Sequence, residues 1–189
     1  MAASATRPGG PSDALLVASA RAGQAWATEA LFRRYAPMVC GLSLRLLGNG
    51  GDADDLAQDC FATAFLRLGR LENPDAFAGW LRGIVVRTAY KRLRTRRLLS
   101  RLGLRSADPI ETDTLISRTA PPDVTARLRE IYAVLQDLPA DQRVVLVLRK
   151  VEGLKLEEIA RATSLSLATV KRRLAEAERT LATHDSEES

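Results

Sequence analysis

The stretch from Leu154 to Leu181 limits the possible folds of this chain more than any other, because its pattern predicts two short helices joined by a tight turn. Leu156, Ile159 and Ala160 recur at helical spacing in the first half. Ser166 follows a break and is a suitable N-cap for the second helix. That helix is expected to bury one face and expose the other. The inward set is Leu167, Val170, Leu174, Ala177 and Leu181, and the outward set is Thr169, Lys171, Arg172, Arg173 and Glu176.

Such a pair of helices is typical of a helix-turn-helix, whose second helix can lie in the major groove of DNA. Lys171, Arg172 and Arg173 stand near the start of that helix, where they are suited to meet phosphates and base edges. Two features of the stretch weaken this interpretation. Ser164 stands where a glycine would ease a left-handed turn, and Glu176 and Glu178 put negative charge beside the expected DNA face. An amphipathic hairpin with a solvated basic face is the alternative that the stretch alone leaves open.

The composition suits a soluble globular protein, and its net charge fits an anionic partner. The 189 residues are enough for one domain or two small ones, with 46% hydrophobic and 27% charged residues. The net charge of +5 is consistent with binding to nucleic acid without proving it. No apolar run approaches the roughly 20 residues that span a bilayer, and the start of the chain lacks the apolar core of a signal peptide. We therefore expect a cytoplasmic protein with no membrane insertion.

The residues that bind metals or perform catalysis are sparse. Cys40 and Cys60 stand alone, and His184 is the only histidine, so neither a structural zinc site nor a disulfide framework is expected. Both cysteines fall on apolar helical faces, which favours buried thiols. Paired acids such as Asp54 and Asp55 are explained by a helix start. We expect no catalytic residue, no metal and no cofactor.

Helical periodicity continues through the N-terminal part of the chain. After a disordered tail over residues 1–12, Asp13 is expected to cap a helix over 14–22, and a longer helix follows over about 26–47. Pro37 interrupts the pattern of the longer helix, and the glycines after Leu47 stop it. The expected inner side of this helix is Leu31, Phe32, Tyr35, Val39, Leu42, Leu46 and Leu47.

The next helix, which begins at Asp52, carries an excess of acid in its early turns. Acid in a first turn is favourable helix chemistry, because it complements the helix dipole. Gln58 and Asp59 lie beyond that turn, so an exposed acidic face for a basic partner is an equally good interpretation. The sequence leaves these two alternatives open.

A helix from 76 to about 97 joins aromatic residues to a dense basic end. Phe77 and Trp80 stand near its start, and the basic residues of its last turns are Lys91, Arg92, Arg94, Arg96 and Arg97. Rings can stack on bases while arginines hold phosphates, a pattern typical of proteins that bind single-stranded or distorted nucleic acid. The alternative places the rings in the core and solvates the basic end. The basic run is too dense for dipole compensation alone, which favours nucleic acid, although Trp80 is expected to be mostly core.

The rest of the chain completes a prediction of an all-α protein with two small helical domains. Periodicity lapses over 98–122, as in a flexible interdomain linker, and returns in a helix over 123–138. Pro139 fits the first turn of another helix, which stops at Gly153. The expected segments are a disordered tail (1–12), a helical domain (13–97), the linker (98–122), a helix-turn-helix domain (123–182) and a frayed tail (183–189).

The order of these segments resembles a known family. Residues 52–65, followed by 77–97, resemble region 2 of the sigma-70 family of bacterial RNA polymerase sigma factors. Residues 138–181 resemble their region 4, and the short linker is similar to that of the extracytoplasmic-function group. Each motif alone is weak, whereas their order, spacing and joint presence are specific.

The resemblance implies a protein that binds core RNA polymerase, recognises the −10 and −35 promoter elements and promotes DNA melting. It implies contacts to the clamp helices of the largest subunit by Asp55, Gln58, Asp59 and Phe61. The loop 71–75 would capture a flipped base of the −10 element, and the residues implied around it are Asn73, Trp80, Arg87, Lys91, Arg92, Arg94, Arg96 and Arg97. The −35 set is Ser166, Thr169, Lys171, Arg172 and Arg173. Region 4 would dock on the flap of the second-largest subunit, and an anti-sigma factor is a further expected partner.

The chain departs from the family pattern at a few positions. Val86-Arg87 and Lys91 stand where the family often has Arg-Asn and an acid, and Lys155 replaces a common capping serine. Glu176 and Glu178 replace common basic residues. Two competing hypotheses remain, which are a stand-alone dimeric helix-turn-helix regulator and a protein-interaction module without promoter activity. The acidic face and the aromatic-basic helix of the N-terminal half speak against the first, and the second predicts no polymerase-dependent transcription.

Overall fold

The computed structural model describes residues 10–48, 50–102, 135 and 138–187, and over these ranges the chain is helical without strands. The all-α class is therefore confirmed for this part of the chain, and the helix expected over 123–138 lies almost entirely outside it. The N-terminal elements are α1 (Asp13–Arg21), α2 (Ala25–Leu47), α3 (Gly50–Leu66), the 3₁₀ turns η1 (Leu68–Arg70) and η2 (Pro74–Ala76), and α4 (Phe77–Arg101). The C-terminal elements are α7 (Ala140–Leu146), the π-helical turn η3 (Val147–Val151), α8 (Leu156–Thr163) and α9 (Leu167–Glu187).

The start of α1 differs from the prediction. Ser12, not Asp13, is the N-cap, and its hydroxyl oxygen accepts a 3.2 Å hydrogen bond from the amide of Leu15. The carboxylate of Asp13 is buried because α2 supplies two partners for it, the guanidinium of Arg34 at 2.6 Å and the hydroxyl of Tyr35. Burial and this hydrogen bond raise the pKa of Tyr35, so the phenol stays protonated and joins α1 to α2.

The other helix ends combine local signals with tertiary packing. Gly48 ends α2 in the left-handed conformation that glycine adopts without strain, and its amide donates to the carbonyl of Leu44 at 2.7 Å. Pro139 is the N-cap of α7 rather than part of its first turn. Helix α4 continues to Arg101 and α9 to Glu187, so residues 98–101 and 183–187 are helical where a linker and a frayed tail were expected.

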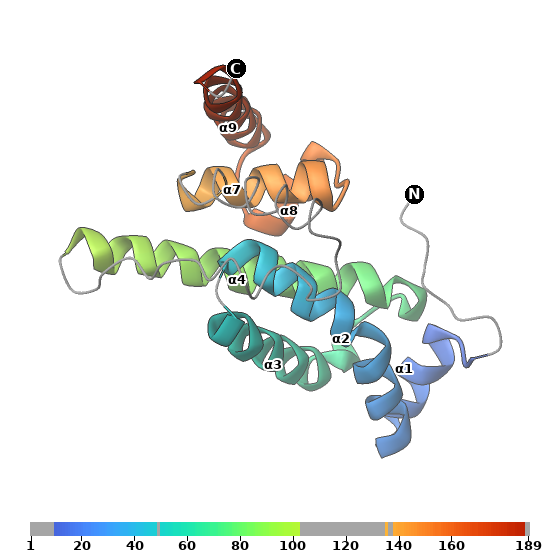
Figure 1. The fold of residues 1–189 in the computed structure, drawn as a ribbon. Coiled ribbons are helices and arrows are strands. Elements are labelled where there is room, and N and C mark those ends of the chain that lie inside the picture. The colour runs from blue at the N-terminus through green and yellow to red at the C-terminus, as the bar shows by residue number, and fades with distance from the viewer. Residues whose placement is uncertain (1–9, 49, 103–134, 136–137, 188–189) are drawn as a thin grey trace, which may run out of the picture.

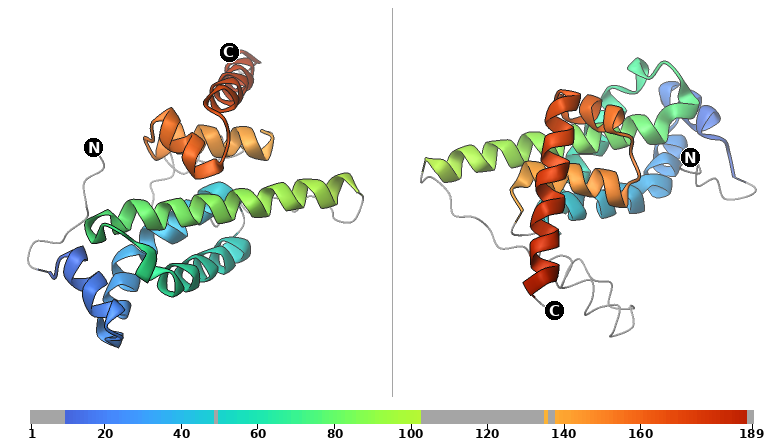
Figure 2. Two further views of the ribbon diagram at one scale, coloured as in Figure 1. Left: turned by 180° about the vertical axis from the view of Figure 1, so that it is seen from behind. Right: turned by 90° about the horizontal axis from the view of Figure 1, so that it is seen from above.

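Helix α4 lies at the centre of the molecule (Figure 1). Helices α2, α3, α7 and α8 all pack against it, with α3 below it and α7 and α8 above it in the view of Figure 1, while α9 packs on α7 and α8 and projects away (Figure 2). One apolar cluster includes Phe77 and Leu81 of α4 together with Val144, Leu148 and Ile159 of the C-terminal part. The N-terminal module (α1 to α4) and the C-terminal module (α7 to α9) therefore share a packed interface in this structure. The expected domain boundaries stay a prediction.

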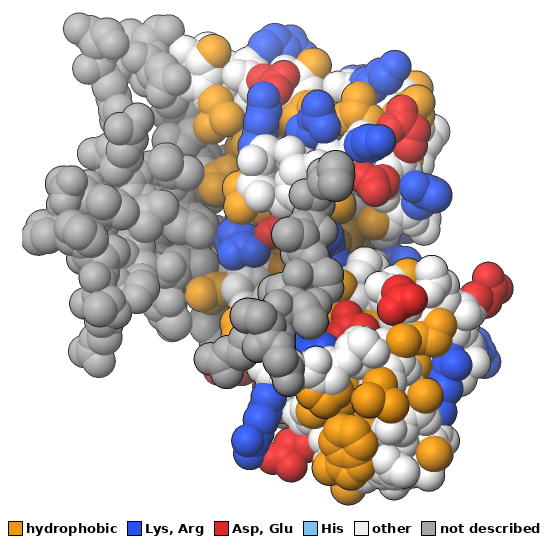
Figure 3. Space-filling model, turned by 90° about the vertical axis from the view of Figure 1, so that its right-hand side faces the viewer, with side chains coloured by type: hydrophobic (Ala, Val, Ile, Leu, Met, Phe, Trp, Pro, Cys, Tyr) orange, Lys and Arg blue, Asp and Glu red, His pale blue; other side chains and the backbone are white. Residues whose placement is uncertain are grey.

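Some apolar side chains remain at the surface. Phe32, expected on the inner side of α2, is 45% exposed. Leu15 of α1 and Trp26 of α2 are half exposed. Figure 3, which views the molecule from the right-hand side of Figure 1, shows apolar side chains gathered on the lower part of that face, where α1 and α2 lie. Within the described ranges, no helix is both long and apolar enough to cross a bilayer.

Candidate nucleic-acid and polymerase interfaces

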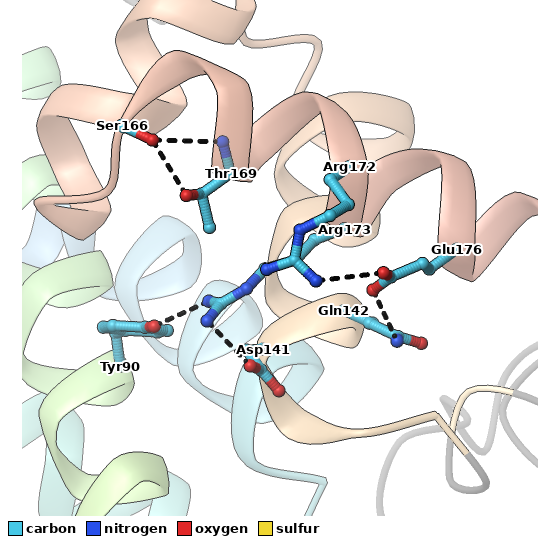
Figure 4. A network of polar contacts seen from close by, with 8 residues as sticks. All are labelled: Tyr90, Asp141, Gln142, Ser166, Thr169, Arg172, Arg173 and Glu176. Atoms are coloured by element: carbon cyan, nitrogen blue, oxygen red, sulfur yellow. Dashed lines mark hydrogen bonds and ion pairs between the residues drawn. The ribbon is translucent and has the colours of Figure 1, made fainter.

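The turn between α8 and α9 has the local structure of a helix-turn-helix. Ser164 ends α8 with a left-handed backbone (φ 58°), and the next amide, of Leu165, donates to the carbonyl of Ala160 at 3.1 Å. The hydroxyl oxygen of Ser166 accepts a 3.1 Å hydrogen bond from the amide of Thr169 and makes a second, at 2.8 Å, with the Thr169 hydroxyl (Figure 4). The expected N-cap at Ser166 is therefore confirmed, and Thr169 is held at the start of α9.

Lys171 and Arg172 lie on the solvent side of α9, as the pattern predicts. The side chain of Arg172 is 64% exposed and forms an ion pair with Glu176 at 3.1 Å. Glu176 also accepts a 3.1 Å hydrogen bond from the side-chain amide of Gln142 on α7 (Figure 4). The negative charge near the expected DNA face is therefore held between two donors of the protein itself.

Arg173 has a different environment from its two neighbours. Only 16% of its side chain is exposed, and its Nη1 donates a 2.8 Å hydrogen bond to the hydroxyl of Tyr90 on α4. Its Nη2 lies 2.9 Å from a carboxylate oxygen of Asp141 on α7 (Figure 4). The expectation that Arg173 points outward is therefore wrong for this conformation, because partners on α4 and α7 draw the guanidinium inward.

The segment between α3 and α4 presents Asn73 to solvent. The side-chain oxygen of Asn73 accepts a 3.0 Å hydrogen bond from the amide of Asp75, so it caps the turn η2. Trp80 is half-buried near the start of α4, and the centre of its ring lies 6.0 Å from that of the fully buried Phe77. The sequence-based view that Trp80 is mostly core agrees with this position, which leaves part of the indole accessible.

The basic run of α4 divides into two sets. Arg92 pairs with Asp59 and Arg96 pairs with Asp52, and these contacts hold α4 against α3. The exposed set is Arg87, Lys91 and Arg94. The side chain of Arg97 lies outside the described residues. One part of the basic run therefore compensates the acids of α3, and the other part faces solvent and is available to a partner.

The acidic face of α3 is only partly free for a partner. Asp55 and Gln58 are exposed, whereas Asp59 shares its charge with α4. Phe61 is 4% exposed, and its ring lies 4.6 Å from that of Phe32 in α2, measured between ring centres. Phe61 therefore belongs to the core, and its expected direct contact with polymerase does not fit this position.

A groove of about 920 Å³ runs between α4 and the turn of the helix-turn-helix. Its walls carry cations from both sides, with Arg87, Lys91 and Arg94 from α4 and Arg173 from α9. The structure thus brings together residues that the sequence assigns to two separate DNA elements. The periodicity of apolar residues within one helix does not indicate which residues of other helices will lie beside it.

Glu152 also joins the two modules, and the sequence analysis missed it. Its carboxylate pairs with Arg45 of α2 and lies 3.6 Å from Nε of Arg82 on α4. Only 9% of its side chain is exposed. An acid just before Gly153 has no local pattern that distinguishes it from a solvated residue at a helix end, so no sequence signal pointed to this role.

The cysteines occupy unlike positions, and the expectation of two buried thiols is wrong for Cys40, which is exposed. Cys60 is buried, and burial raises the pKa of its thiol to about 11. Among the described residues, no three His, Cys, Asp or Glu side chains gather in a way that could hold a metal ion.

Comparison with known proteins identifies related sequences and a related fold. The chain matches sigma-70 region 2 over residues 31–98 and sigma-70 region 4 over residues 128–181. It is 32% identical to the RNA polymerase sigma-H factor of Pseudomonas aeruginosa over 170 residues, covering 86% of this chain and 88% of that protein. It is 30% identical to the ECF RNA polymerase sigma-E factor of Escherichia coli over 169 residues, with the same coverage of 86% and 88%.

A solved structure shares the fold. It is the sigma factor RpoE in complex with the anti-sigma factor NepR from Bartonella quintana, with a TM-score of 0.63 and 22% identity over 81% of this chain and 92% of that chain. Region 2 thus precedes region 4 along the chain, in the order that the sequence predicts. The chain belongs to the sigma-70 family of RNA polymerase sigma factors, in its extracytoplasmic-function group.

Proposed function

We propose that this chain directs core RNA polymerase to promoters by reading a −35 and a −10 element and by helping to separate the strands at the second. The observation that carries the proposal is the presence, in one chain, of a capped helix-turn-helix with exposed cations and of α4, which follows the loop 71–75 that holds Asn73 and carries exposed cations of its own in its later turns. A regulator that binds only duplex DNA needs the first of these and has no use for the second.

For the −35 element, the first turns of α9 enter the major groove. Thr169, Lys171 and Arg172 reach base edges and phosphates, and Ser166 holds the start of the helix in shape. Arg173 takes part only after its contacts with Tyr90 and Asp141 are released.

For the −10 element, the loop 71–75 receives a base flipped out of the duplex, with Asn73 as its polar contact. Unstacking a base costs a few kcal/mol, which a fitted pocket repays. Trp80, near the start of α4, is a further candidate contact for the −10 element. The cations that hold the DNA backbone further along α4 are Arg87, Lys91 and Arg94, with Arg92, Arg96 and Arg97 as further candidates.

The polymerase contact begins on α3. Asp55 and Gln58 face solvent there and bind the clamp helices of the largest subunit, with Asp59 at the edge of the contact. The helix-turn-helix module docks on the flap of the second-largest subunit. Held on polymerase, the two modules engage two DNA elements together, so the second contact becomes intramolecular and avidity rises by about 10² or more. The polymerase supplies the chemistry, and this chain supplies no catalytic residue.

An anti-sigma factor is the further partner that we propose. The solved relative RpoE was captured with the anti-sigma factor NepR, and this chain shares its fold. Such a partner would act by covering the surfaces of α3 and α4 that the polymerase and the −10 element need.

The proposal is tested by mixing the purified chain with bacterial core RNA polymerase and a library of promoter fragments, then sequencing the transcripts. The expected result is a set of new start sites preceded by two shared elements at constant spacing. Start sites identical to those of core polymerase alone would contradict it. Tight binding of the free chain to a palindromic site would instead identify a stand-alone regulator.

A further inference from the structure

Arg21, the last residue of α1, reaches across to the segment that precedes the Asn73 loop. Its Nε and Nη2 donate hydrogen bonds of 3.2 and 3.0 Å to the carbonyl oxygen of Leu68, and Nη2 also donates to the carbonyl oxygen of Leu71. The two carbonyls lie at either end of η1. One guanidinium therefore bridges both ends of this short turn.

The same turn is fixed from its other side by apolar packing. Leu68 and Leu71 are only 4% and 5% exposed and belong to the main core. The turn is thus held between the core and Arg21. The planar fork of an arginine suits two neighbouring carbonyls, whereas the single ammonium of a lysine does not span them in the same way.

Asn73 follows directly from this clamped turn. It lies two residues beyond the carbonyl of Leu71, and its side chain caps η2 through the amide of Asp75. Helix α1 packs against η2 as well as η1. The position of Asn73 therefore depends on α1, an element that lies outside the stretch over which region 2 matches this chain.

We propose that Arg21 is a positioning residue for the loop 71–75, which it holds ready to receive the flipped base without touching DNA itself. The inference rests on the function proposed above for that loop. A flipped base is captured only if the receiving groups are already in place, because a mobile loop must lose conformational freedom on binding. Arg21 removes that freedom in advance.

The test compares Arg21→Gln with Arg33→Gln in holoenzyme reconstituted from the full chain and core RNA polymerase. Arg33 is the matched control, since it lies on α2 in an exposed ion pair with Glu29, so its loss changes the charge equally and leaves η1 alone. The DNA is a promoter found in the transcript-sequencing experiment, with 2-aminopurine at the flipped position of the −10 element. A separate duplex carries only the −35 element.

The expected result for Arg21→Gln is affinity for the −10 single strand lower by about tenfold, together with weaker 2-aminopurine fluorescence in the open complex. Affinity for the −35 duplex stays equal to that of Arg33→Gln. Arg21→Lys restores the charge without the fork and is expected to recover only part of the loss.

Two results would overturn the inference. One is an Arg21→Gln holoenzyme that matches Arg33→Gln on the −10 strand. The other is an equal loss on both DNA elements together with a lower melting temperature of the free chain, which would mean a role in folding alone. If the wild-type holoenzyme opens no promoter at all, the proposed function fails first, and this inference falls with it.

Discussion

The guanidinium of Arg173 on α9 donates a 2.8 Å hydrogen bond to the hydroxyl of Tyr90 on α4. The same side chain also pairs with Asp141, so both sides of its fork are engaged within the protein. A guanidinium that is 16% exposed and held in this way cannot contact a base edge at the same time. Packing of the modules and use of Arg173 on DNA therefore exclude each other.

Replacing Tyr90 with Phe is expected to keep the ring in place and remove the hydroxyl that accepts from Arg173. The free energy of unfolding should fall by about 1 kcal/mol, as for a typical hydrogen bond, and urea denaturation measures it. Because the packed arrangement is weakened, the free chain should bind a −35 duplex up to about fivefold more tightly in fluorescence anisotropy. Unchanged values of both quantities would contradict a role for this contact.

Replacing Glu152 with Gln is expected to lower stability by about 2 kcal/mol, since Arg45 and Arg82 lose the charge that they share. The matched control is Glu29→Gln, which removes an exposed pair with Arg33 and should change stability by less than about 0.5 kcal/mol. Denaturant titration of the two variants gives both values. Equal stabilities would show that Glu152 contributes no more than a surface residue.

Replacing Arg172 with Ala should weaken −35 binding by holoenzyme and lower the slope of log affinity against log salt by about 1, because one phosphate contact is lost. Arg172 is 64% exposed, so the fold is expected to be undisturbed. Arg179→Ala is the control, as Arg179 is exposed further along the same helix. A salt titration of binding in which the two variants behave alike would remove Arg172 from the −35 set.

Replacing Asp55 with Lys should lower the affinity for core RNA polymerase by about tenfold, since it places the wrong charge on the exposed face of α3. Glu29→Lys makes the same change of charge on α2 and is expected to have little effect. Surface plasmon resonance with immobilised core enzyme compares the variants. Asp59 is less suitable for this test because it also pairs with Arg92.

The two cysteines should differ in their reaction with iodoacetamide. The thiolate is the reactive form, so a raised pKa lowers the reactive fraction at a given pH. With its pKa near 11, buried Cys60 is only about one-thousandth thiolate at about pH 8, and its rate should rise as pH approaches that value. Exposed Cys40 should be labelled first, although the partial burial of its thiol raises its pKa somewhat as well. Mass spectrometry of partly labelled protein checks the order, and earlier labelling of Cys60 would contradict it.

Much of the architecture could be predicted because its causes are local. The end of α2 follows from Gly48, and the start of α9 follows from the hydroxyl of Ser166. The helical class and the helix-turn-helix follow from the spacing of apolar residues along each segment. In the same way, the exposure of Lys171 and Arg172 follows from their place on α9.

The use of each charge was decided only by the tertiary structure. Arg92, Arg96 and Arg173 belong to basic runs that look uniform in the sequence, yet each is paired with a residue on another helix. Arg21 and Glu152 are likewise ordinary helix-end charges until the fold brings distant carbonyls and guanidinium groups beside them. The physical reason is that helical periodicity determines the face on which a side chain lies, whereas its partner depends on which helices pack together.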